Sequence, residues 1–409
     1  MSCKSTIRTL EHLRVACKLH GGPAGSRRAP GGGASSAFGA SGRFPWVHWM
    51  GTCEVVDDCV KRKQSWDDFV AWEPCTGFMQ SSWWSDFMAS TGWDHFGMVL
   101  RDRGTIVGGA TIWRWAYDAE HCFYFVPEGP VLMQADAIAD QAQVFQAFMG
   151  FIDEKRRHDT CVVSHLRIEP PWERLPAFVH EFCEVGEYFH VPRDTLLIDL
   201  KLSDTDILSQ MKSKGRYNVG VARKHGVSIV EDTSERGVLD FCQMQNEMCE
   251  RKEIKGHGLD YFQRLIPLLA RMGHGAVYFA EYHGIRLAAA VVIIFGNVAT
   301  YLYGASRATH RNVMAPYLLH FHIMQEAKAR GCEIYDLFGI SPQHEGQNGW
   351  TSFSEFKRKL GGREMSWVPS LDHVYDSGAY AHYQESLQAK QNASVGLLSN
   401  SVFPITERT

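Results

Sequence analysis

The stretch that decides the fold is AVYFAEYHGIRLAAAVVIIFGNVATYLYGAS, residues 276–306. Three runs rich in β-branched, aromatic and small residues are separated by short turns that contain glycine, which is typical of antiparallel strands joined by hairpins. A segment with helical spacing follows from about Ala315 to Arg330, and then comes a further strand-like run, EIYDLFGI, at 333–340. The pattern predicts an α/β unit in which a β-meander leads into a helix and one more strand.

The same order of elements occurs once before in the chain. The earlier copy consists of GMVLRD (97–102), TIVGGATIWRW (105–115), CFYFVPEGPVL (122–132), a helix from about Asp136 to Arg157, and CVVSHLRIEPPW (161–172). Both copies place a glycine-containing turn before a strand of small residues, in RGTIVGGATI (103–112) and in HGIRLAAAVV (283–292). An ancient duplication would explain the match. We therefore predict an α/β fold of two tandem acetyltransferase-like (GNAT-type) domains.

The segment between the two copies shows no heptad pattern, so we expect no coiled-coil insert. We interpret it as the strand TLLIDL (195–200), one long helix from about Asp204 to Lys224, the strand VSIVED (227–232), and helices near 235–251 and 259–271. The predicted domains are a first unit at 65–194, a second unit at 195–370, and a C-terminal helix and tail at 371–409.

Residues 1–60 differ from the rest of the chain in composition. Within them, residues 1–53 hold five arginines against a single acid, Glu11, and include GGPAGSRRAPGGGASSAFGASG at 21–42. Such a segment cannot bury a core, so we expect it to be disordered and its removal to leave folding unchanged. An Arg-rich start is also typical of an organellar transit peptide, but amphipathic spacing is confined to Thr6–Lys18. We favour an extension without function, or an upstream start codon chosen in error.

The overall charge and the cysteines narrow the class of protein. A formal net charge of −4 and a pI near 6.5 give the chain no general attraction to polyanions. Eleven cysteines are scattered and never form C-x-x-C, which indicates reduced thiols and neither a zinc site nor a disulfide framework. No apolar run approaches the roughly 20 residues that cross a bilayer. We therefore expect a soluble, cytoplasmic chain.

Any contact with a polyanion must then use a local basic patch. The densest basic run is MKSKGRYNVGVARKHGV at 211–227. Its cations, with one tyrosine among them as a stacking surface, are Lys212, Lys214, Arg216, Arg223, Lys224 and Tyr217. Phosphates of a tRNA backbone or a pyrophosphate would use such a run, and their binding would weaken with added salt. A solvated helix face is the alternative for any single member.

Six stretches in fixed order carry a family resemblance. They are GFMQSSWWSDF (77–87), VPEGPVL (126–132), the basic run, TYLYGAS (300–306), APYLLHFHIMQEAKARGCEIYDLFGI (315–340) and FKRKLGG (356–362). From about Trp66 to Trp367 the chain resembles the FemABX family of peptidoglycan interpeptide-bridge aminoacyltransferases. The resemblance implies an aminoacyl-tRNA donor, a muropeptide or lipid-linked cell-wall precursor whose free amine is extended, and peripheral contact with a membrane. It implies no metal, no other cofactor and no DNA partner, and a C-terminal end that folds back on the first domain.

Lys357 is the first candidate catalytic residue. Aminolysis of an ester needs a positioned amine and stabilisation of the oxyanion of the tetrahedral intermediate, but no enzyme nucleophile. In SFSEFKRKLGG (352–362) one helix face is apolar, and Lys357 lies at its border beside Phe356, so the ammonium can point inward. An ordinary surface lysine is the alternative. The resemblance implies that Lys357 stabilises the oxyanion or the terminal phosphate of the tRNA, with Phe356 packed near it.

Two further positions follow from strand geometry. Asp336 lies near the end of EIYDLFGI, where strands of open α/β sheets meet ligands, and it could orient or deprotonate the amine. The alternative is a structural role, in which the Asp336 carboxylate caps a neighbouring backbone segment or pairs with an arginine. Tyr301 and Tyr303 alternate with Leu302, so strict alternation places both on one side of their strand. We expect Tyr303 at the acceptor and core packing for at least one of the pair.

The acceptor side is where this sequence departs from the family. Related chains often carry a lysine after the Q-x-x-x-W signature, where this chain has Met88, and an arginine where it has His257 ahead of Tyr261. Because those cations are associated with acceptor phosphates, the identity of the acceptor stays open. By resemblance Tyr261, His257 and Trp84 are still candidates for binding the acceptor, with core packing as the alternative for Trp84.

Two other functions compete with this interpretation. One is an N-acyltransferase of the same tandem fold that acts on an exopolysaccharide or a small metabolite and uses an acyl-CoA. The expected Gly-rich pyrophosphate loop is not evident in VPEGPVL or in GASRATHRN (304–312), which favours a tRNA donor. The other is a noncatalytic module that binds cell-wall precursors, against which Lys357 and Asp336 in their motifs argue.

Overall fold

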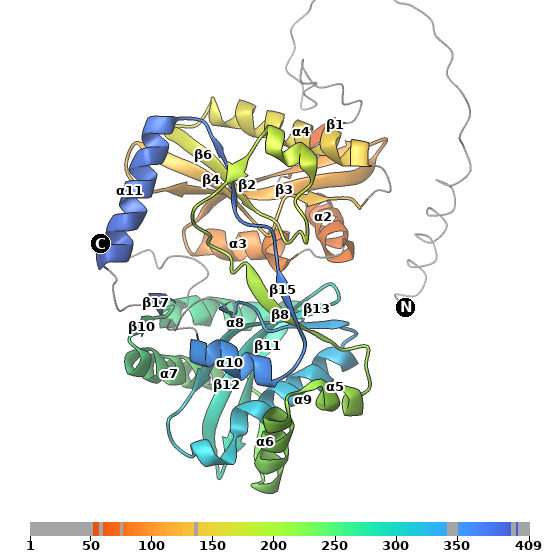
Figure 1. Ribbon diagram of the computed structural model, residues 1–409, viewed down its shortest axis with the longest axis vertical. Coiled ribbons are helices and arrows are strands. Elements are labelled where there is room, and N and C mark those ends of the chain that lie inside the picture. Colours follow the sequence, from red (N-terminus) through yellow and green to blue (C-terminus); the bar gives the residue numbers. More distant parts are fainter. Residues whose placement is uncertain are drawn as a thin grey trace, which may run out of the picture. The chain divides into compact units, whose positions relative to one another are not determined.

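In a computed structural model, the chain forms two β-sheets flanked by helices (Figure 1). The structure describes residues 52–56, 60–73, 77–134, 138–341, 351–393 and 398–399. Most of the segment at 1–60, and part of the tail at 371–409, lie outside these ranges. Within the described residues no helix is long and apolar enough to cross a membrane.

The first sheet has the strand order β1-β2-β3-β4-β6-β16-β7, with β5 beside β3. The strands are β1 (Thr52–Val56), β2 (Asp94–Asp102), β3 (Thr105–Ala116), β4 (His121–Pro127), β5 (Val131–Leu132), β6 (Val162–Glu169), β7 (Glu184–Val185) and β16 (Leu371–Val374). The helices of this half are α2 (Val60–Trp72), η1 (Phe78–Gln80), α3 (Ser82–Ser90), α4 (Ile138–Arg156), η2 (Ala177–Glu181) and α11 (Ser377–Ala393). The strands and helix expected from the earlier copy are confirmed.

The sheet begins earlier in the chain than we expected. β1 pairs with β2 in an antiparallel ladder from Thr52↔Arg101 to Val56↔Gly97. The prediction of disorder for residues 1–60 is therefore wrong at 52–56. Composition could not predict this five-residue strand, because its hydrogen-bond partners come from a neighbouring strand and it needs no core of its own.

The second sheet has the order β15-β8-β14-β13-β12-β11-β9. Its strands are β8 (Asp194–Asp199), β9 (Ser228–Glu231), β11 (Gly275–Tyr282), β12 (Ile285–Phe295), β13 (Val298–Ser306), β14 (Ile334–Asp336) and β15 (Arg363–Ser366). Its helices are α5 (Asp204–Gln210), α6 (Ser213–Lys224), α7 (Glu235–Lys252), α8 (Leu259–Met272), η3 (Arg311–Val313), α9 (Ala315–Ala329) and α10 (Thr351–Lys359). A short pair, β10 (Ile254–Lys255) and β17 (Leu398–Ser399), lies apart from both sheets.

The single long helix expected at 204–224 is wrong, because the chain breaks into α5 and α6. Met211 and Lys212 both have extended backbone, with ψ of 147° and 148°. The guanidinium of Arg216 bridges the break by donating to the carbonyl oxygens of Ser209, at 2.8 Å, and of Met211. A helical hydrophobic period runs through the break, so spacing alone could not reveal it.

Three clusters of buried side chains form the core. One joins α4 to its face of the first sheet, and a second joins α6, α9 and α10 to one face of the second sheet. The third contains residues of α2, α3, α7 and α8 together with the remaining faces of both sheets. Contacts such as the stacking of Trp83 on His274, with centroids 4.9 Å apart, connect the halves. The two repeats thus share a core.

The last segment of the chain returns to the first sheet. β15 pairs with β8 of the second sheet, whereas β16, five residues later, pairs with β6 of the first. α11 packs against β6, as Figure 1 shows for the dark blue helix. A buried ion pair between Arg167 and Asp372, 2.7 Å apart, fixes β16 to β6.

Candidate active site

The central feature of the second half is an opening between two parallel strands. β13 and β14 pair over only three residues, from Val298↔Ile334 to Thr300↔Asp336. Beyond Asp336 the chain follows β8 instead, since the amide of Leu337 donates to the carbonyl of Leu196 at 2.9 Å. In the first half the equivalent parallel strands, β4 and β6, stay paired from His121 to Pro127. Only the second half is open at this point.

Lys357 fills this opening from α10. Its ammonium donates to the carbonyl oxygens of Gly339 at 2.7 Å and of Phe338 at 3.2 Å. It also lies over the rings of Phe353 and Tyr301, 4.0 Å and 5.6 Å from their centroids. The side chain is 2% exposed, so the alternative of a surface lysine is wrong. Two of the three N–H groups have backbone acceptors, and one can serve a substrate oxygen.

Burial changes the charge of this lysine. It lowers the pKa of Lys357 to about 7, while the nearby Asp336 carboxylate opposes the change. The ammonium and the free amine are therefore both populated near neutral pH. The lysine is a cation held by dipoles and aromatic faces, with no carboxylate in direct contact among the described residues.

The helix that carries Lys357 is fixed at both ends. At its start the hydroxyl of the buried Ser354 accepts from the amide of Ser341 at 2.8 Å. At its end Gly361 and Gly362 have φ of 90° and 92°, a region that side chains rarely adopt. A Cβ atom on Gly362 would also lie 2.6 Å from the carbonyl oxygen of Leu197. The two glycines therefore let the chain turn directly from α10 into β15.

Phe356 packs behind the opening. Its ring meets the rings of Tyr317 and His320, with centroids 5.1 Å and 5.5 Å away. His320 is buried, and its Nδ1 lies 2.8 Å from the hydroxyl of Tyr335. Burial, together with the charge of Lys357, lowers the pKa of His320 to about 3, so this imidazole is neutral. Phe356 thus packs against the core on the helix that carries Lys357, and its role beside the lysine stays a prediction.

Asp336 lies at the end of β14 and faces a cavity. Its Oδ1 accepts from the hydroxyl of Thr195 and from the amide of Phe338, the latter at 2.7 Å. Burial raises the pKa of this carboxyl, against the effect of those two hydrogen bonds and of Lys357. A carboxyl with a raised pKa is suited to accept a proton near neutral pH.

The cavity is built by both halves of the chain. Its walls carry two further acids, a proline-rich rim and one arginine: Glu128, Glu169, Pro170, Pro171, Phe189, Val191, Pro192, Arg193, Thr195, Asp336, Phe338, Trp367, Val368 and Ser370. Burial raises the pKa of Glu128 to about 8 and of Glu169 to about 7. Glu169 accepts from the amides of His190 and Val191, and Glu128 from that of Met79 at 3.0 Å. Three carboxyls of raised pKa thus face one space.

Sequence reasoning missed Glu128 and Glu169. Glu128 follows the buried strand β4 and Glu169 ends the buried strand β6, and both stand next to prolines, in VPEGPVL and RIEPPW. An acid next to proline at the end of an apolar strand was the available signal, and it is a weak one because acids are common in turns. That the two turns face the Asp336 side of the other half depends on how the halves pack, which the sequence does not show.

The two tyrosines of β13 point in opposite directions, so our prediction of a shared face is wrong. A bulge in the ladder places Tyr303 opposite Val291 and Tyr301 opposite Val292, which leaves Leu302 unpaired. Tyr301 joins the cluster around α9 and α10, near Lys357, whereas Tyr303 joins the cluster around α7 and α8. One extra residue in a strand reverses the alternation that follows it.

Tyr303 belongs to a separate aromatic group with Tyr261 and His257. The two tyrosine hydroxyls are 2.9 Å apart, and the rings of His257 and Tyr261 stack with centroids 3.9 Å apart. Burial lowers the pKa of His257 to about 4, and its Nε2 has no hydrogen-bond partner in the described part of the chain. This group can offer hydrogen bonds to a ligand but carries no charge at neutral pH.

Trp84 is a core residue. It is fully buried and contacts the rings of Phe78, Trp83 and Phe87. Its predicted contact with the acceptor is not compatible with this position, because no part of the side chain reaches the surface. The Q-x-x-x-W spacing serves packing here: Gln80 donates to the carbonyl oxygens of Pro127 and Thr111 and so holds the loop that bears Glu128.

The basic run lies on α6 and divides into two kinds of side chain. All of its candidate side chains are exposed, Tyr217 by 71%: Lys212, Lys214, Arg216, Tyr217, Arg223 and Lys224. Two of the cations also have partners within the chain. Arg216 bridges the break before α6, and Arg223 lies over the ring of Phe321, 5.1 Å from its centroid. The start of α6 touches α10, since a Cβ on Gly215 would lie 2.0 Å from the carbonyl oxygen of Lys359. The exposed cations therefore stand beside the helix that carries Lys357.

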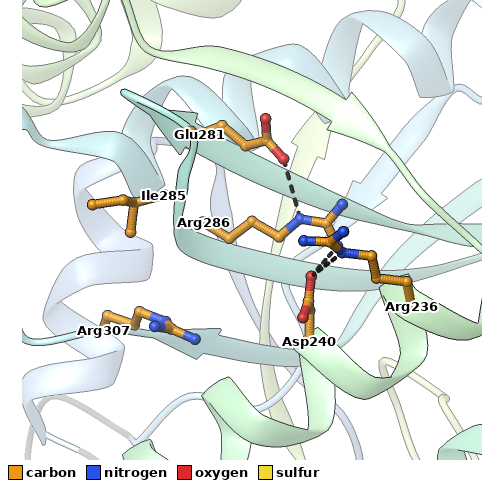
Figure 2. Close-up of a pocket in the computed structure, with 7 residues that line it drawn as sticks. Arg236, Asp240, Glu281, Ile285, Arg286 and Arg307 are labelled. Carbon is orange, nitrogen blue, oxygen red and sulfur yellow. Dashed lines mark hydrogen bonds and ion pairs between the residues drawn. The ribbon is translucent and has the colours of Figure 1, made fainter.

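A second pocket lies at the turn between β11 and β12. Arg236, Asp240, Glu281, Gly284, Ile285, Arg286 and Arg307 line it, and Figure 2 shows Arg286 between the two acids. Arg286 pairs with Asp232 at 2.5 Å, with Asp240 at 3.0 Å and with Glu281 at 3.1 Å. Because three carboxylates already neutralise it, the pocket is a weak candidate for an anion, and none of the predicted site residues lines it.

The fold and the site define an acyltransferase built from two tandem α/β domains. A family model described as the FemAB family matches residues 176–270 and 275–384, which together make up half of the 409-residue chain. The chain belongs to the FemAB family.

The chain aligns with several named relatives over nearly the whole length of those relatives. The lipid II:glycine glycyltransferase of Staphylococcus epidermidis is 20% identical over 403 residues, which include 80% of this chain and 94% of that enzyme. The UDP-N-acetylmuramoylpentapeptide-lysine N(6)-alanyltransferase of Weissella viridescens is 21% identical over 336 residues, 78% of this chain and 95% of that one. The crystal structure of FemX matches with a TM-score of 0.72 at 15% identity, over 80% of this chain and 99% of that one. The tandem fold is confirmed.

Proposed function

We propose that this protein transfers an amino acid from an aminoacyl-tRNA to a free amine of a peptidoglycan precursor. The observation that carries the proposal is the Lys357 ammonium in the opening between β13 and β14, beside a cavity lined by Asp336. The relatives named for glycyl and alanyl transfer onto cell-wall precursors support the acceptor class. The transfer reaction would take place in the cytoplasm, and the protein would contact the membrane surface where the acceptor is lipid-linked.

The reaction needs four changes of bonding. The acceptor nitrogen attacks the ester carbonyl carbon, the carbonyl oxygen becomes an oxyanion, the bond to the ribose oxygen breaks, and the amine proton passes to that oxygen. Lys357 supplies a positive charge where the oxyanion forms, since one of its N–H groups is available. Asp336, whose pKa is raised, accepts the amine proton and returns it to the leaving ribose oxygen.

The donor would approach along α6. Lys212 and Lys214 are exposed next to α10, and Tyr217 offers a flat surface among them. These side chains suit the phosphates and the terminal bases of a tRNA acceptor end. Arg216 and Arg223, which already have partners, contribute less to this surface than the sequence suggested.

The acceptor would occupy the cavity between the halves. The amine must lose a proton before it attacks, and a carboxylate of raised pKa in this cavity, such as Asp336, can accept that proton. Tyr303, Tyr261 and His257 would hold neighbouring polar groups of the acceptor by hydrogen bonds rather than by charge, because His257 is neutral. These three side chains carry no positive charge, so they would not bind phosphates of the acceptor as cations would.

A direct test mixes the purified chain with separately charged tRNAs and candidate muropeptides, and weighs the products by mass spectrometry. One added aminoacyl mass on the muropeptide, dependent on the charged tRNA, is the expected result. Acyl transfer from an acyl-CoA to a sugar or small metabolite, with none from charged tRNA, would replace the proposal by the alternative acyltransferase. Binding of the muropeptide without any transfer would indicate a noncatalytic module.

A further inference from the structure

A group of potential metal ligands lies on the first half, outside the site described above. Asp118, His121 and His382 each offer one ligand atom, and these atoms all lie within 4.8 Å of one another. Asp118 lies in the turn that joins β3 to β4 and His121 begins β4, whereas His382 comes from α11. Residues 264 positions apart thus meet on one small surface.

The spacing of the atoms suits a small divalent ion. His121 Nδ1 is 3.0 Å from Asp118 Oδ2, and His382 Nε2 is 3.1 Å from the same oxygen. Ligands of a tetrahedral ion at about 2.0 to 2.1 Å stand roughly 3.3 Å apart, close to these two distances, and the nitrogens of His121 and His382 lie within 4.8 Å of each other. Two imidazoles and one carboxylate, with a fourth position left for water, are donors that Zn²⁺ accepts.

The carboxylate is held in place for this role. Asp118 Oδ1 accepts from the amides of Glu120 and His121, both at 2.8 Å. Those bonds fix the carboxylate, whose Oδ2 lies near both histidines, while His121 Nδ1 is also 3.0 Å from Oδ1. Orientation of a ligand by hydrogen bonds to its second atom is a common feature of metal sites in proteins. Without a metal ion, His121 Nδ1 and His382 Nε2 must each carry a proton to hydrogen-bond to this carboxylate.

The surrounding contacts already bring α11 close to the turn. The hydroxyl of Tyr117 donates to the carbonyl oxygen of Ala379 at 2.9 Å, and the ring of Tyr117 stacks on His121. On the inner side of α11 the hydroxyl of Tyr383 lies 3.1 Å from His190 Nε2. An ion at the outer side would therefore hold a helix whose position is largely set.

We infer that Asp118, His121 and His382 form a binding site for a divalent transition ion of the Zn²⁺ class, which fixes α11 to the β3–β4 turn. The site is independent of the proposed transfer reaction, because its residues line neither the Lys357 opening nor the acceptor cavity. Its expected effect is on the stability of the first half, since the ion binds the folded chain and the unfolded chain lacks the assembled ligands.

The test uses the full chain, stripped with EDTA and returned to chelator-free buffer. Calorimetric titration with ZnCl₂ should show a site of unit stoichiometry, and a hundredfold excess over Kd should raise the melting temperature by roughly 3 to 5 °C. MgCl₂, which prefers six oxygen ligands, should cause no such rise. The absence of a zinc-dependent rise in the wild-type chain would overturn the inference.

Matched variants assign the binding to these residues. His382→Ala should keep the metal-free melting temperature, because its side chain is 53% exposed, yet weaken zinc binding at least about tenfold and abolish the rise. His158→Ala is the control, since His158 lies 3.2 Å from a single carboxylate, Glu154, without a third ligand. Zinc binding by His382→Ala equal to that of the wild type would place the metal elsewhere and refute the site.

Discussion

The ammonium of Lys357 lies 2.7 Å from the carbonyl oxygen of Gly339. If β13 and β14 paired over a longer stretch, an amide of β13 would be expected to donate to this carbonyl instead. The lysine therefore takes over the hydrogen bonding of backbone carbonyls that the divergence of the strands leaves without partners. In the first half β4 and β6 remain paired, and no such opening forms. This asymmetry indicates why, of two similar halves, the second is the candidate for chemistry.

Replacement of Lys357 should remove transfer without unfolding the protein. Lys357→Met keeps most of the stem's packing but deletes a charge directed at the oxyanion, and loss of one such contact lowers the rate about 10² to 10³-fold. Lys357→Arg should recover only part of the rate, because a planar guanidinium is not a point charge. Single-turnover transfer from charged tRNA measures both. Lys359→Met, on the same helix, serves as the control, and a wild-type rate for Lys357→Met would refute the assigned centre.

The lowered pKa of Lys357 predicts a specific dependence of stability on pH. The group titrates near 7 in the folded chain and near 10.4 when unfolded, so between these values the unfolded chain binds more protons. The free energy of unfolding of the wild type should therefore rise with pH relative to Lys357→Met, by about 2 to 3 kcal/mol from pH 7 to pH 9. Below about pH 6, where Lys357 is protonated in both states, the difference should be constant.

Urea unfolding of the two chains at pH 6, 7, 8 and 9 measures this difference, and titrating groups that do not interact with Lys357 cancel in the comparison. The Lys359→Met variant should follow the wild type at every pH. A difference between wild type and Lys357→Met that does not change with pH would show that Lys357 keeps an ordinary pKa in the folded chain.

The exposed cations at the start of α6 should act on donor binding rather than on chemistry. Lys212→Ala with Lys214→Ala should raise the KM for charged tRNA several-fold, leave kcat nearly unchanged, and reduce the dependence of KM on salt. Arg216 is kept, because its loss would also open the break between α5 and α6. Arg271→Ala, an exposed cation on α8, is the control. An unchanged KM with an unchanged salt dependence would make the run a solvated helix face.

Much of the fold could be predicted because the signals are local. The helices at 235–252, 259–272 and 315–329 lie within one or two residues of their predicted limits, and the repeated strands follow from alternating apolar runs. The inward position of Lys357 followed from helical spacing together with two glycines that end the helix. In each case neighbours in sequence determine the outcome.

The features that could not be predicted depend on partners distant in sequence. The bulge at Leu302, which separates Tyr301 from Tyr303, is defined only by the register with β12. The cavity exists because turns of the first half, with Glu128 and Glu169, face Asp336 of the second. Such relations follow from how the two halves pack, and no pattern within a single segment records them.

The strand β1 gives a last prediction, which opposes the expectation that residues 1–60 are dispensable. β1 supplies a five-residue ladder to β2. A chain that begins at Val60 keeps α2 but leaves the edge of β2 unpaired, so it should lose roughly 2 to 5 kcal/mol of stability, at about 1 kcal/mol for each ladder hydrogen bond. A chain that begins at Thr52 retains the ladder and should melt as the full chain does.

Thermal unfolding of the three chains, with transfer activity measured well below the transition, separates a loss of stability from a loss of the site. Because the Lys357 opening lies in the other sheet, the shorter chain should keep its turnover number while folded. Equal melting temperatures for the chains that start at Thr52 and Val60 would show that β1 contributes nothing to the sheet.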